Sequence, residues 1–358
     1  ELAKLKALEA EREARRIAVA NQNAARLEKV ARKNPTLALQ MAGFILEDNT
    51  ENPSVLSAFH DLISDTAQVF YNKELKTSRA INDLALSPDG SRILTGTAST
   101  RAILWDQSGS ILDTLAGHRY QVTAVAFLGD HKMVTGDYYG RLVIWNQEGV
   151  PIDTLVGHKA RITDIKTTRK QEIITTSQDR MAILWGADGQ TIDTLSTNRT
   201  GILSVAISKN GERIFTGHVD KKIIQWERGI PTDTLLGHTG YIYALEFSAD
   251  ERMLLSASSD KTARLWDLSK QSYTTFTGHS GAINTACFSP DGLQVLTGSS
   301  DRTIKLWDLK GNELQTFEED LQAVRGLAFA PDGRHFYSAE SSKARLWNLR
   351  GLELTNYN

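Results

Sequence analysis

Short apolar and β-branched runs bounded by Gly, Asp, Asn and Ser fill the chain from about residue 79 onward. The run "QVLTGSS" at 294–300 and the run "IKLWD" at 304–308 are typical examples. Runs of this length and composition between turn residues predict strands joined by tight hairpins. The same succession of runs returns several times, so each unit is expected to hold four short antiparallel strands.

Tryptophan marks the period of these units. The seven tryptophans are separated by 40, 40, 41, 40, 41 and 40 residues, and each ends a β-type run such as "AILWD" or "ARLWN". Even spacing of a rare residue indicates internal repeats, and a period near 40 with a Trp-Asp signature is typical of propeller blades. They are Trp105, Trp145, Trp185, Trp226, Trp266, Trp307 and Trp347.

Two further signals recur in register with the tryptophans. Gly-His pairs end at His118, His158, His238 and His279, and the turn sequences "SPDG" or "APDG" occupy 87–90, 289–292 and 330–333. Pro presets φ for a turn and Gly accepts a positive φ, so these tetrapeptides predict hairpin turns.

Together these residues resemble the WD40-repeat family, with seven repeats over residues 79–358. The resemblance implies an all-β, seven-bladed β-propeller, and we expect residues 1–78 to form a small α-helical segment before it.

In that family a His, a Ser or Thr, an Asp and the Trp hydrogen-bond in a line across each blade. Three repeats carry the whole set, which the resemblance assigns a structural role: His158–Thr175–Asp179–Trp185, His238–Ser256–Asp260–Trp266 and His279–Thr297–Asp301–Trp307. In the second repeat Tyr139 stands where Asp is expected, and in the fourth Asn198 stands where His is expected. The first and last repeats lack both residues.

A His, an Asp and a hydroxyl could suggest catalytic triads. We reject this interpretation because the set recurs around a ring, whereas an active site is usually singular. Catalysis with a metal in the central channel is a remote alternative, but no ligand spacing joins the remaining histidines. We therefore expect no enzyme activity, no catalytic residues, no cofactor and no metal.

The ring needs an outer strand for its last blade, since open sheet edges invite aggregation. The sequence "GLELTNYN" at 351–358 parallels "GNELQTF" at 311–317 and is the favoured candidate; "VFYNKEL" at 69–75 is the competitor. Asp113, Asp153, Asp193 and Asp233 recur in four nearly identical outer strands, where a solvated acidic band is the simplest interpretation.

Residues 1–33 contain no Gly or Pro and predict a long charged helix, followed by two short helices that begin near Pro35 and Pro53. A charged helix, then "NPTLALQMAG", then WD40 repeats is similar to the C-terminal part of bacterial signal-transduction NTPases of the STAND class. No phosphate-binding "GxxxxGK" occurs in the chain, so the resemblance implies an NTPase domain upstream of Glu1.

The net charge of −2 gives no bulk attraction to nucleic acid or to anionic membranes, and neither partner is expected. The single cysteine, Cys287, excludes an internal disulfide and a Cys-based zinc site. No apolar run is long enough to span a bilayer, and we expect no signal peptide and a cytoplasmic location. The first residue is Glu rather than Met, which indicates a piece of a longer protein.

The resemblance favours a binding platform that holds a protein partner or ligand on the face bearing the Gly-His loops, as a sensor in signal transduction. A structural scaffold or oligomerisation module is the alternative. Tyr and Arg are enriched in binding hot spots. The residues expected on that face are Arg119, Tyr120, Gln121, Tyr138, Tyr139, Arg161, Arg199, Tyr241, Tyr243 and Arg325.

Overall fold

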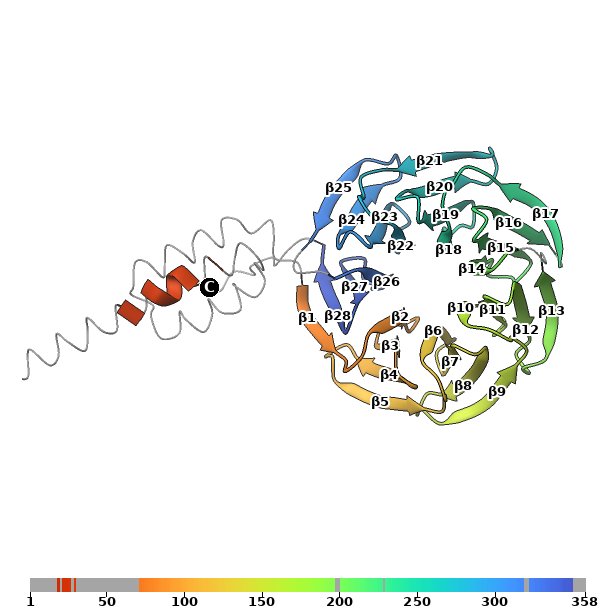
Figure 1. Ribbon diagram of the computed structural model, residues 1–358, viewed down its shortest axis with the longest axis horizontal. Coiled ribbons are helices and arrows are strands. Elements are labelled where there is room, and N and C mark those ends of the chain that lie inside the picture. Colours follow the sequence, from red (N-terminus) through yellow and green to blue (C-terminus); the bar gives the residue numbers. More distant parts are fainter. Residues whose placement is uncertain are drawn as a thin grey trace, which may run out of the picture. The chain divides into compact units, whose positions relative to one another are not determined.

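The propeller expected from the repeats is the fold observed. A computed structural model describes residues 18–19, 21–26, 29, 71–196, 200–227, 229–318 and 322–349. Seven four-stranded antiparallel sheets stand as blades around a central channel (Figure 1). The described residues between 18 and 29 are helical, and the other helices expected before residue 71 lie outside the described residues. None of the helical residues described belongs to a stretch long and apolar enough to cross a membrane.

Each blade runs from an inner strand beside the channel to an outer strand at the rim. The first four blades consist of β2 Ile81–Leu86, β3 Arg92–Thr97, β4 Arg101–Asp106, β5 Ile111–Ala116; β6 Val122–Leu128, β7 Lys132–Asp137, β8 Arg141–Asn146, β9 Pro151–Val156; β10 Ile162–Thr167, β11 Ile173–Ser177, β12 Met181–Trp185, β13 Thr191–Ser196; and β14 Ile202–Ile207, β15 Arg213–His218, β16 Ile223–Glu227, β17 Ile230–Leu235. The last three consist of β18 Ile242–Phe247, β19 Met253–Ser258, β20 Ala263–Asp267, β21 Ser272–Phe276; β22 Ile283–Phe288, β23 Gln294–Ser299, β24 Ile304–Asp308, β25 Glu313–Phe317; and β26 Val324–Phe329, β27 His335–Glu340, β28 Lys343–Asn348 with β1 Tyr71–Lys76.

The predicted turns join the inner strand of a blade to the next strand. In the first blade the Gly90 N–H donates to the Ser87 carbonyl over 2.8 Å, and Gly90 has φ 72°. The Ser87 hydroxyl donates to the Asp89 carboxylate over 2.6 Å, which fixes the turn further. Gly adopts such a φ most freely and is favoured here, although Gln171 and Glu251 take the same position in the third and fifth blades with φ 60° and 57°.

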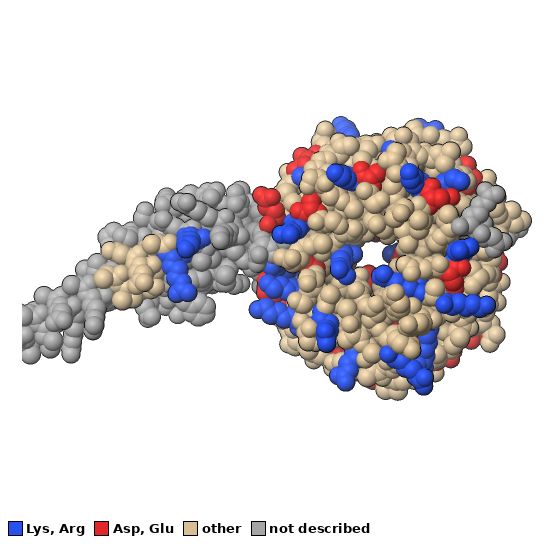
Figure 2. Space-filling model, in the orientation of Figure 1, with Lys and Arg blue, Asp and Glu red and all other residues tan. Residues whose placement is uncertain are grey.

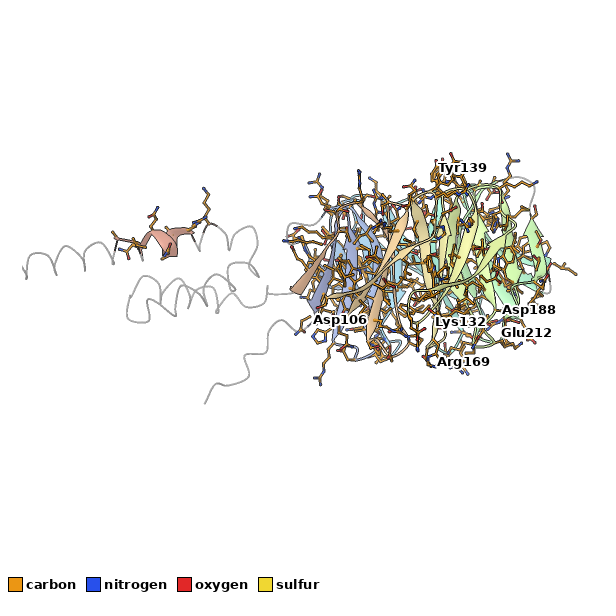
Figure 3. All side chains as sticks on the ribbon, turned by 90° about the horizontal axis from the view of Figure 1, so that it is seen from below. Asp106, Lys132, Tyr139, Arg169, Asp188 and Glu212 are labelled. Atoms are coloured by element: carbon orange, nitrogen blue, oxygen red, sulfur yellow. The ribbon has the colours of Figure 1, made fainter. Side chains whose placement is uncertain are left out.

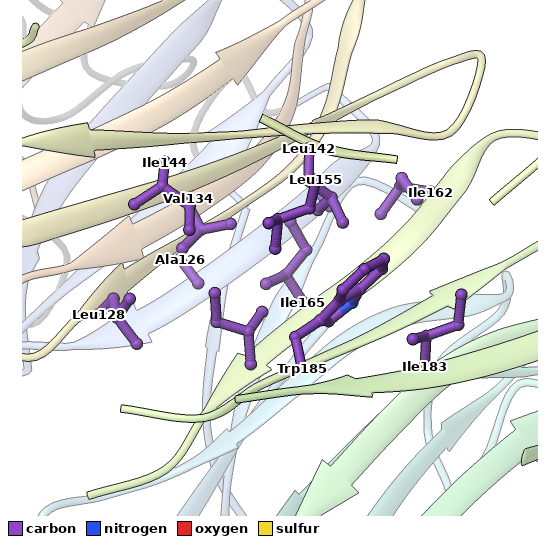
Figure 4. Packing of buried hydrophobic residues seen from close by; sticks show 12 residues of the cluster. Ala126, Leu128, Val134, Leu142, Ile144, Leu155, Ile162, Ile165, Ile183 and Trp185 are labelled. Atoms are coloured by element: carbon purple, nitrogen blue, oxygen red, sulfur yellow. The ribbon is translucent and has the colours of Figure 1, made fainter. Parts of the chain in front are cut away.

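The hydrophobic core lies between neighbouring blades. Between the second and third blades, Ala126, Val134 and Ile144 face Ile165 and Trp185, and all of them are buried (Figure 4). Each sheet therefore packs both faces on neighbours, as in stacked sheets generally. This explains why the middle strands are buried on both faces, including the hydroxyl residues Thr175, Thr176 and Ser177 of β11, while the outer strands are largely exposed.

The outer strand of the last blade is β1, which pairs with β28. The expectation that 351–358 supplies this strand was therefore wrong; the competing segment near residue 71 does so, and 351–358 lies outside the described residues. The physical reason is a charge match. Glu74 of β1 contacts Lys343 over 3.1 Å and Arg345 over 3.2 Å. The Arg345 side chain is fully buried and also pairs with Glu340 over 3.3 Å, so it needs carboxylates around it.

The acidic residues of the outer strands have a packing role that the sequence did not suggest. A Cβ built on Gly149, in the turn of the next blade, would lie 1.8 Å from Oδ2 of Asp113. Asp193 approaches Gly229 in the same way, at 2.3 Å. These carboxylates therefore pack against neighbouring turns instead of forming only a solvated band.

Replacing Glu74 by Gln is expected to lower the free energy of unfolding by roughly 1–3 kcal/mol, because Arg345 loses one of its buried counter-charges. Urea denaturation followed by tryptophan fluorescence would measure the loss. Lys76→Gln is the matched control on the same strand; Lys76 is 73% exposed and its removal should change stability by less than about 0.5 kcal/mol. Equal stability of the Glu74→Gln variant and the wild type would contradict closure by β1.

Candidate binding site at the channel mouth

A buried line of hydrogen bonds crosses the third blade as the family resemblance implied. The Trp185 indole N–H donates to Thr175 Oγ1 over 2.9 Å. Thr175 Oγ1 lies 2.9 Å from His158 Nε2, and His158 Nδ1 lies 2.9 Å from Asp179 Oδ2. An indole only donates and an ionised carboxylate only accepts. The protons therefore run in one direction: the Thr175 hydroxyl donates to Nε2, and Nδ1–H donates to Asp179.

Blades five and six repeat this line. His238 and Ser256 are 2.7 Å apart and His238 and Asp260 are 2.8 Å apart, while Trp266 donates to Ser256 over 2.9 Å. In blade six the corresponding members are His279, Thr297, Asp301 and Trp307, with distances of 2.8 to 2.9 Å. Burial would raise the pKa of Asp179, but hydrogen bonds from His158 and from the Lys159 N–H outweigh it and hold the pKa below its usual value.

These hydroxyls are structural and not nucleophilic in their setting. Thr175, Ser256 and Thr297 are wholly buried, and the hydroxyl oxygen of each already accepts a hydrogen bond from an indole N–H. A substrate carbonyl has no approach to such an oxygen, since nucleophilic attack requires the reacting atom within contact distance.

Three of the four incomplete repeats, the second, the fourth and the last, complete their networks from one strand position that the sequence analysis missed. This position lies two residues after the blade hydroxyl. In the second blade Asp137 occupies it and binds His118 over 3.0 Å, so Asp137 replaces the expected acid at Tyr139. In the fourth blade His218 occupies it and contacts Thr216 over 2.8 Å, in place of a loop His. In the last blade Glu340 occupies it and pairs with Arg345.

Asp137→Ser is expected to destabilise the propeller by about 2–4 kcal/mol, because His118 loses its carboxylate inside the blade. Ser is the residue found at this position in the third blade, where Ser177 is followed by Asp179. Adding Tyr139→Asp should recover about half of the loss or more, since it rebuilds the arrangement of the third blade. Urea unfolding of the two variants would measure both effects, and a double variant no more stable than the single one would disprove the equivalence.

The loops of the propeller fall on two opposite faces. Tyr139 lies on one face, whereas Asp106, Lys132, Arg169, Asp188 and Glu212 lie on the other (Figure 3). We call the first the His-loop face, because its loops also carry the Gly-His pairs. Exposed tyrosines gather there: Tyr120 stacks on Tyr139 at 4.1 Å between ring centroids, and Tyr138 meets Tyr139 at 5.5 Å. Their side chains are 41 to 58% exposed, which is unusual for large rings on a surface.

A β-bulge opens each of the seven inner strands at the channel end of the His-loop face. The register of each inner strand skips its second residue, so that residue has no partner on the next strand. Bulges re-aim side chains and are common beside sites. All seven unpaired residues line one cavity of about 340 Å³, and we call them the bulge ring: Asn82, Thr123, Thr163, Leu203, Tyr243, Asn284 and Arg325.

Four members of the bulge ring tie neighbouring blades together. Each donates a side-chain hydrogen bond of 2.7 to 2.8 Å to the carbonyl of the first residue in the next inner strand, and they are Asn82, Thr123, Thr163 and Asn284. Tyr243, Arg325 and Leu203 make no such bond. Ser204, the next residue, donates in place of Leu203 over 3.2 Å. In the part of the chain that the structure describes, Tyr243 is therefore the polar ring member whose side chain makes no hydrogen bond to a neighbouring blade, and Arg325 makes only a long one, 3.4 Å, to the Asn82 amide oxygen of the first blade.

Arg161 lies immediately before β10 and lines the same cavity. Its Nε is buried without a hydrogen-bond partner, and no carboxylate among the described residues forms an ion pair with it or with Arg325. Burial lowers the pKa of the Arg161 guanidinium, and the positive charge of Arg325 lowers it further, while Tyr138 and the Asp83 carboxylate raise it. Two arginines thus face one cavity, with only a 3.4 Å contact from Arg325 to the Asn82 amide oxygen. Figure 2 looks onto this face and shows Lys and Arg atoms beside the central opening.

Carboxylates appear deeper in the channel, and they are engaged. Asp83 accepts from the Val125 N–H over 2.8 Å, and Asp164 accepts from the Val205 N–H over 3.0 Å and lies 3.6 Å from Lys166. Glu246 accepts from the Phe288 N–H over 3.2 Å. Burial raises the pKa of Asp83 to about 6 and that of Glu246 to about 7, against these hydrogen bonds. Near neutral pH this layer therefore carries less negative charge than its composition suggests.

The residues expected to bind a partner divide into two groups in the structure. Arg161, Tyr243 and Arg325 meet in the cavity, with Tyr241 next to Tyr243 at 6.3 Å between ring centroids. Arg119, Tyr120 and Tyr138 are exposed on the second blade. Gln121 is half-buried and its carbonyl accepts from the Tyr138 N–H over 3.1 Å, which suits a structural role. Arg199 lies outside the described residues.

The sequence analysis missed the amides of the site, Asn82, Asn284 and Gln178. A signal was present: the residue after the first apolar residue of each inner strand recurs every 40 or 41 positions, like the tryptophans. Among the residues that the structure describes, no three His, Cys, Asp or Glu side chains gather into a metal-binding group. Cys287 is buried, and burial holds its pKa well above the usual value.

Comparison with known families agrees with this architecture. The sequence matches the family of the WD domain, G-beta repeat, over six segments: 71–106, 109–146, 189–227, 229–267, 270–308 and 311–348. The first segment begins at β1, and residues 147–188, which no segment covers, still supply β10, β11 and β12 of the third blade. No curated protein sequence matches the chain.

Proposed function

This chain belongs to the WD domain, G-beta repeat family, and we propose that it is a non-catalytic recognition module whose His-loop face binds a protein partner. Propellers of this family are typical protein-interaction scaffolds. The observation that carries the proposal is the placement of Arg161, Tyr243 and Arg325 around one cavity, where they add little to the contacts between blades: the Arg161 Nε is buried without a hydrogen-bond partner, and Arg325 makes only a 3.4 Å contact to Asn82. A buried donor without a partner costs stability, which favours a role outside the fold.

The surroundings of the cavity fit a polypeptide partner. Interface hot spots are enriched in Tyr and Arg and lie at the centre of a contact with a less critical rim around it. Here the cavity would be the centre, and the exposed rings of Tyr120, Tyr139 and Tyr241 would be part of the surround. A rigid ring of sheets holds these groups in place, so little conformational entropy is lost on binding.

We further propose that the module is the C-terminal sensor of a larger signalling ATPase, cytoplasmic and bacterial. This rests on the similarity of "NPTLALQMAG" and the repeats that follow to STAND-class NTPases. The helical segment within 1–78 would then connect the sensor to the ATPase domain. Binding on the His-loop face would be transmitted through that connection.

A photo-reactive benzoyl-phenylalanine placed at Tyr241 is expected to cross-link one partner in the native cells. The same probe at Leu293 is the matched control, because Leu293 is 64% exposed in a turn between inner and second strands, on the opposite face. Mass spectrometry of the adducts would identify the partner. Adducts formed equally from both positions, or only from Leu293, would contradict the proposed face.

The complete gene is expected to encode a "GxxxxGK" phosphate-binding loop upstream of Glu1, because that loop cradles the phosphates of a bound nucleotide. Sequencing the gene and measuring nucleotide binding by the full-length protein would test this. A full-length sequence without such a loop would refute the sensor role in an ATPase and leave the recognition module unaffected.

A further inference from the structure

The channel mouth differs from the rest of the channel in the sign of its charge. Two rings of seven residues border it: the bulge ring, and the residues that precede each inner strand, Ala80, Gln121, Arg161, Gly201, Tyr241, Ala282 and Ala323. Arg325 is the charged residue of the first ring and Arg161 that of the second. No acidic residue occupies either ring, so the mouth carries two positive charges.

The deeper carboxylates do not neutralise these arginines by direct contact. Asp83, Asp164 and Glu246 each accept a hydrogen bond from a backbone N–H of the next inner strand, and Asp164 also pairs with Lys166. They act as links between blades. Asp83 attracts Arg161 without touching it and Arg325 repels it, and the guanidinium of Arg161 makes no ion pair among the described residues. An anion in direct contact with both arginines would offset the repulsion between them.

We infer that the channel mouth receives an acidic side chain, Asp or Glu, of a protein partner, which is bound between Arg161 and Arg325. This inference rests on the proposed function and names the chemistry of its partner. A guanidinium presents several N–H donors in a plane and suits a carboxylate better than any other side chain does. The amides of Asn82, Gln178 and Asn284 around the arginines can hydrogen-bond the partner's backbone.

Several observations favour a peptide over a free inorganic anion. The cavity of about 340 Å³ is large enough for a side chain of a partner. A free inorganic anion needs only a small concavity lined with N–H donors. Tyr243 lines the cavity and Tyr241 stands beside it, so an apolar neighbour of the acidic residue would find an aromatic surface. Such mixed aromatic and Arg surroundings are typical of protein recognition.

Selection of random peptides displayed on phage against the intact chain tests the inference. The enriched peptides are expected to share an Asp or Glu at one fixed position. Arg161→Gln/Arg325→Gln should weaken binding of the best peptide about 30-fold or more, by fluorescence anisotropy. Arg334→Gln, an exposed arginine in an inner-to-second-strand turn of the last blade, is the matched control and should not change it.

A double-mutant cycle separates direct contact from a structural effect. Replacing the acidic residue of the peptide by its amide should cost little further affinity in the double-arginine variant, because both changes remove the same interaction. The variant is also expected to keep or raise its melting temperature, since the repulsion between the two arginines is removed. If the double variant does not fold, Arg325→Gln alone, at an exposed site, answers the same question.

The remaining outcomes overturn the inference in distinguishable ways. The selected peptides could instead lack a shared acidic residue and lose their affinity for the Tyr120→Ala/Tyr241→Ala variant. That result would refute the inference and leave the proposed function intact. Tight binding of inorganic phosphate, with no acidic peptide enriched, would assign the mouth to a free anion instead. If the wild-type chain enriches no peptide beyond those that the Tyr120→Ala/Tyr241→Ala variant also enriches, the result would count against both the inference and the proposed face.

Discussion

The propeller depends on one hydrogen bond, which a buried Trp indole N–H donates to a hydroxyl on the neighbouring strand of its blade. In six blades the Trp donates to a hydroxyl ten residues earlier, across the hairpin of the two middle strands. An unpaired indole N–H inside the core would cost the full desolvation of that group. The hydrogen bond therefore fixes the register of the hairpin, and the fixed register sets which residues of every blade face the channel, the neighbours and the two loops.

Because the indole–hydroxyl hydrogen bond sets the register of each blade, residues at other positions can differ between blades as long as this bond is kept. The position two residues after the hydroxyl shows this: Asp137, His218 and Glu340 each complete a polar network that their own repeat lacks. Ser occupies the same place in the blades that have the full set. The bulge ring shows the same division. Asn and Thr there join blades, Tyr243 does not, and Arg325 makes only a long contact to Asn82, so the same backbone position supports the fold to different degrees in different blades.

The sequence predicted what repeats and left open what does not repeat. Seven tryptophans at a constant interval predict seven equal blades, and the hydrogen-bonded line follows in three of them from residue type alone. Closure could not be predicted in this way, because the choice between 69–75 and 351–358 depends on Glu74 meeting a buried Arg345 that is far away in the sequence. The role of Asp137 was missed because it lies two positions from the expected one, a shift that only the pairing register reveals. The bulges were hidden for the same reason, since a skipped residue leaves the apolar pattern unchanged.

The asymmetry of the ring is what allows a site to exist on it. A perfect sevenfold repeat would place the same side chain at each bulge, and the channel mouth would have no preferred orientation for a partner. Here charge is confined to Arg325 in one ring and Arg161 in the other, on blades that do not adjoin. The layer beneath holds Asp83, Asp164 and Glu246 together with Lys166, and burial raises the pKa of Glu246 to about 7, so this carboxyl is only partly ionised near neutral pH. A partner that enters the mouth as proposed would meet the two arginines first. Because the indole bonds hold the blades beneath rigid, two arginines at fixed points would set the orientation of that partner.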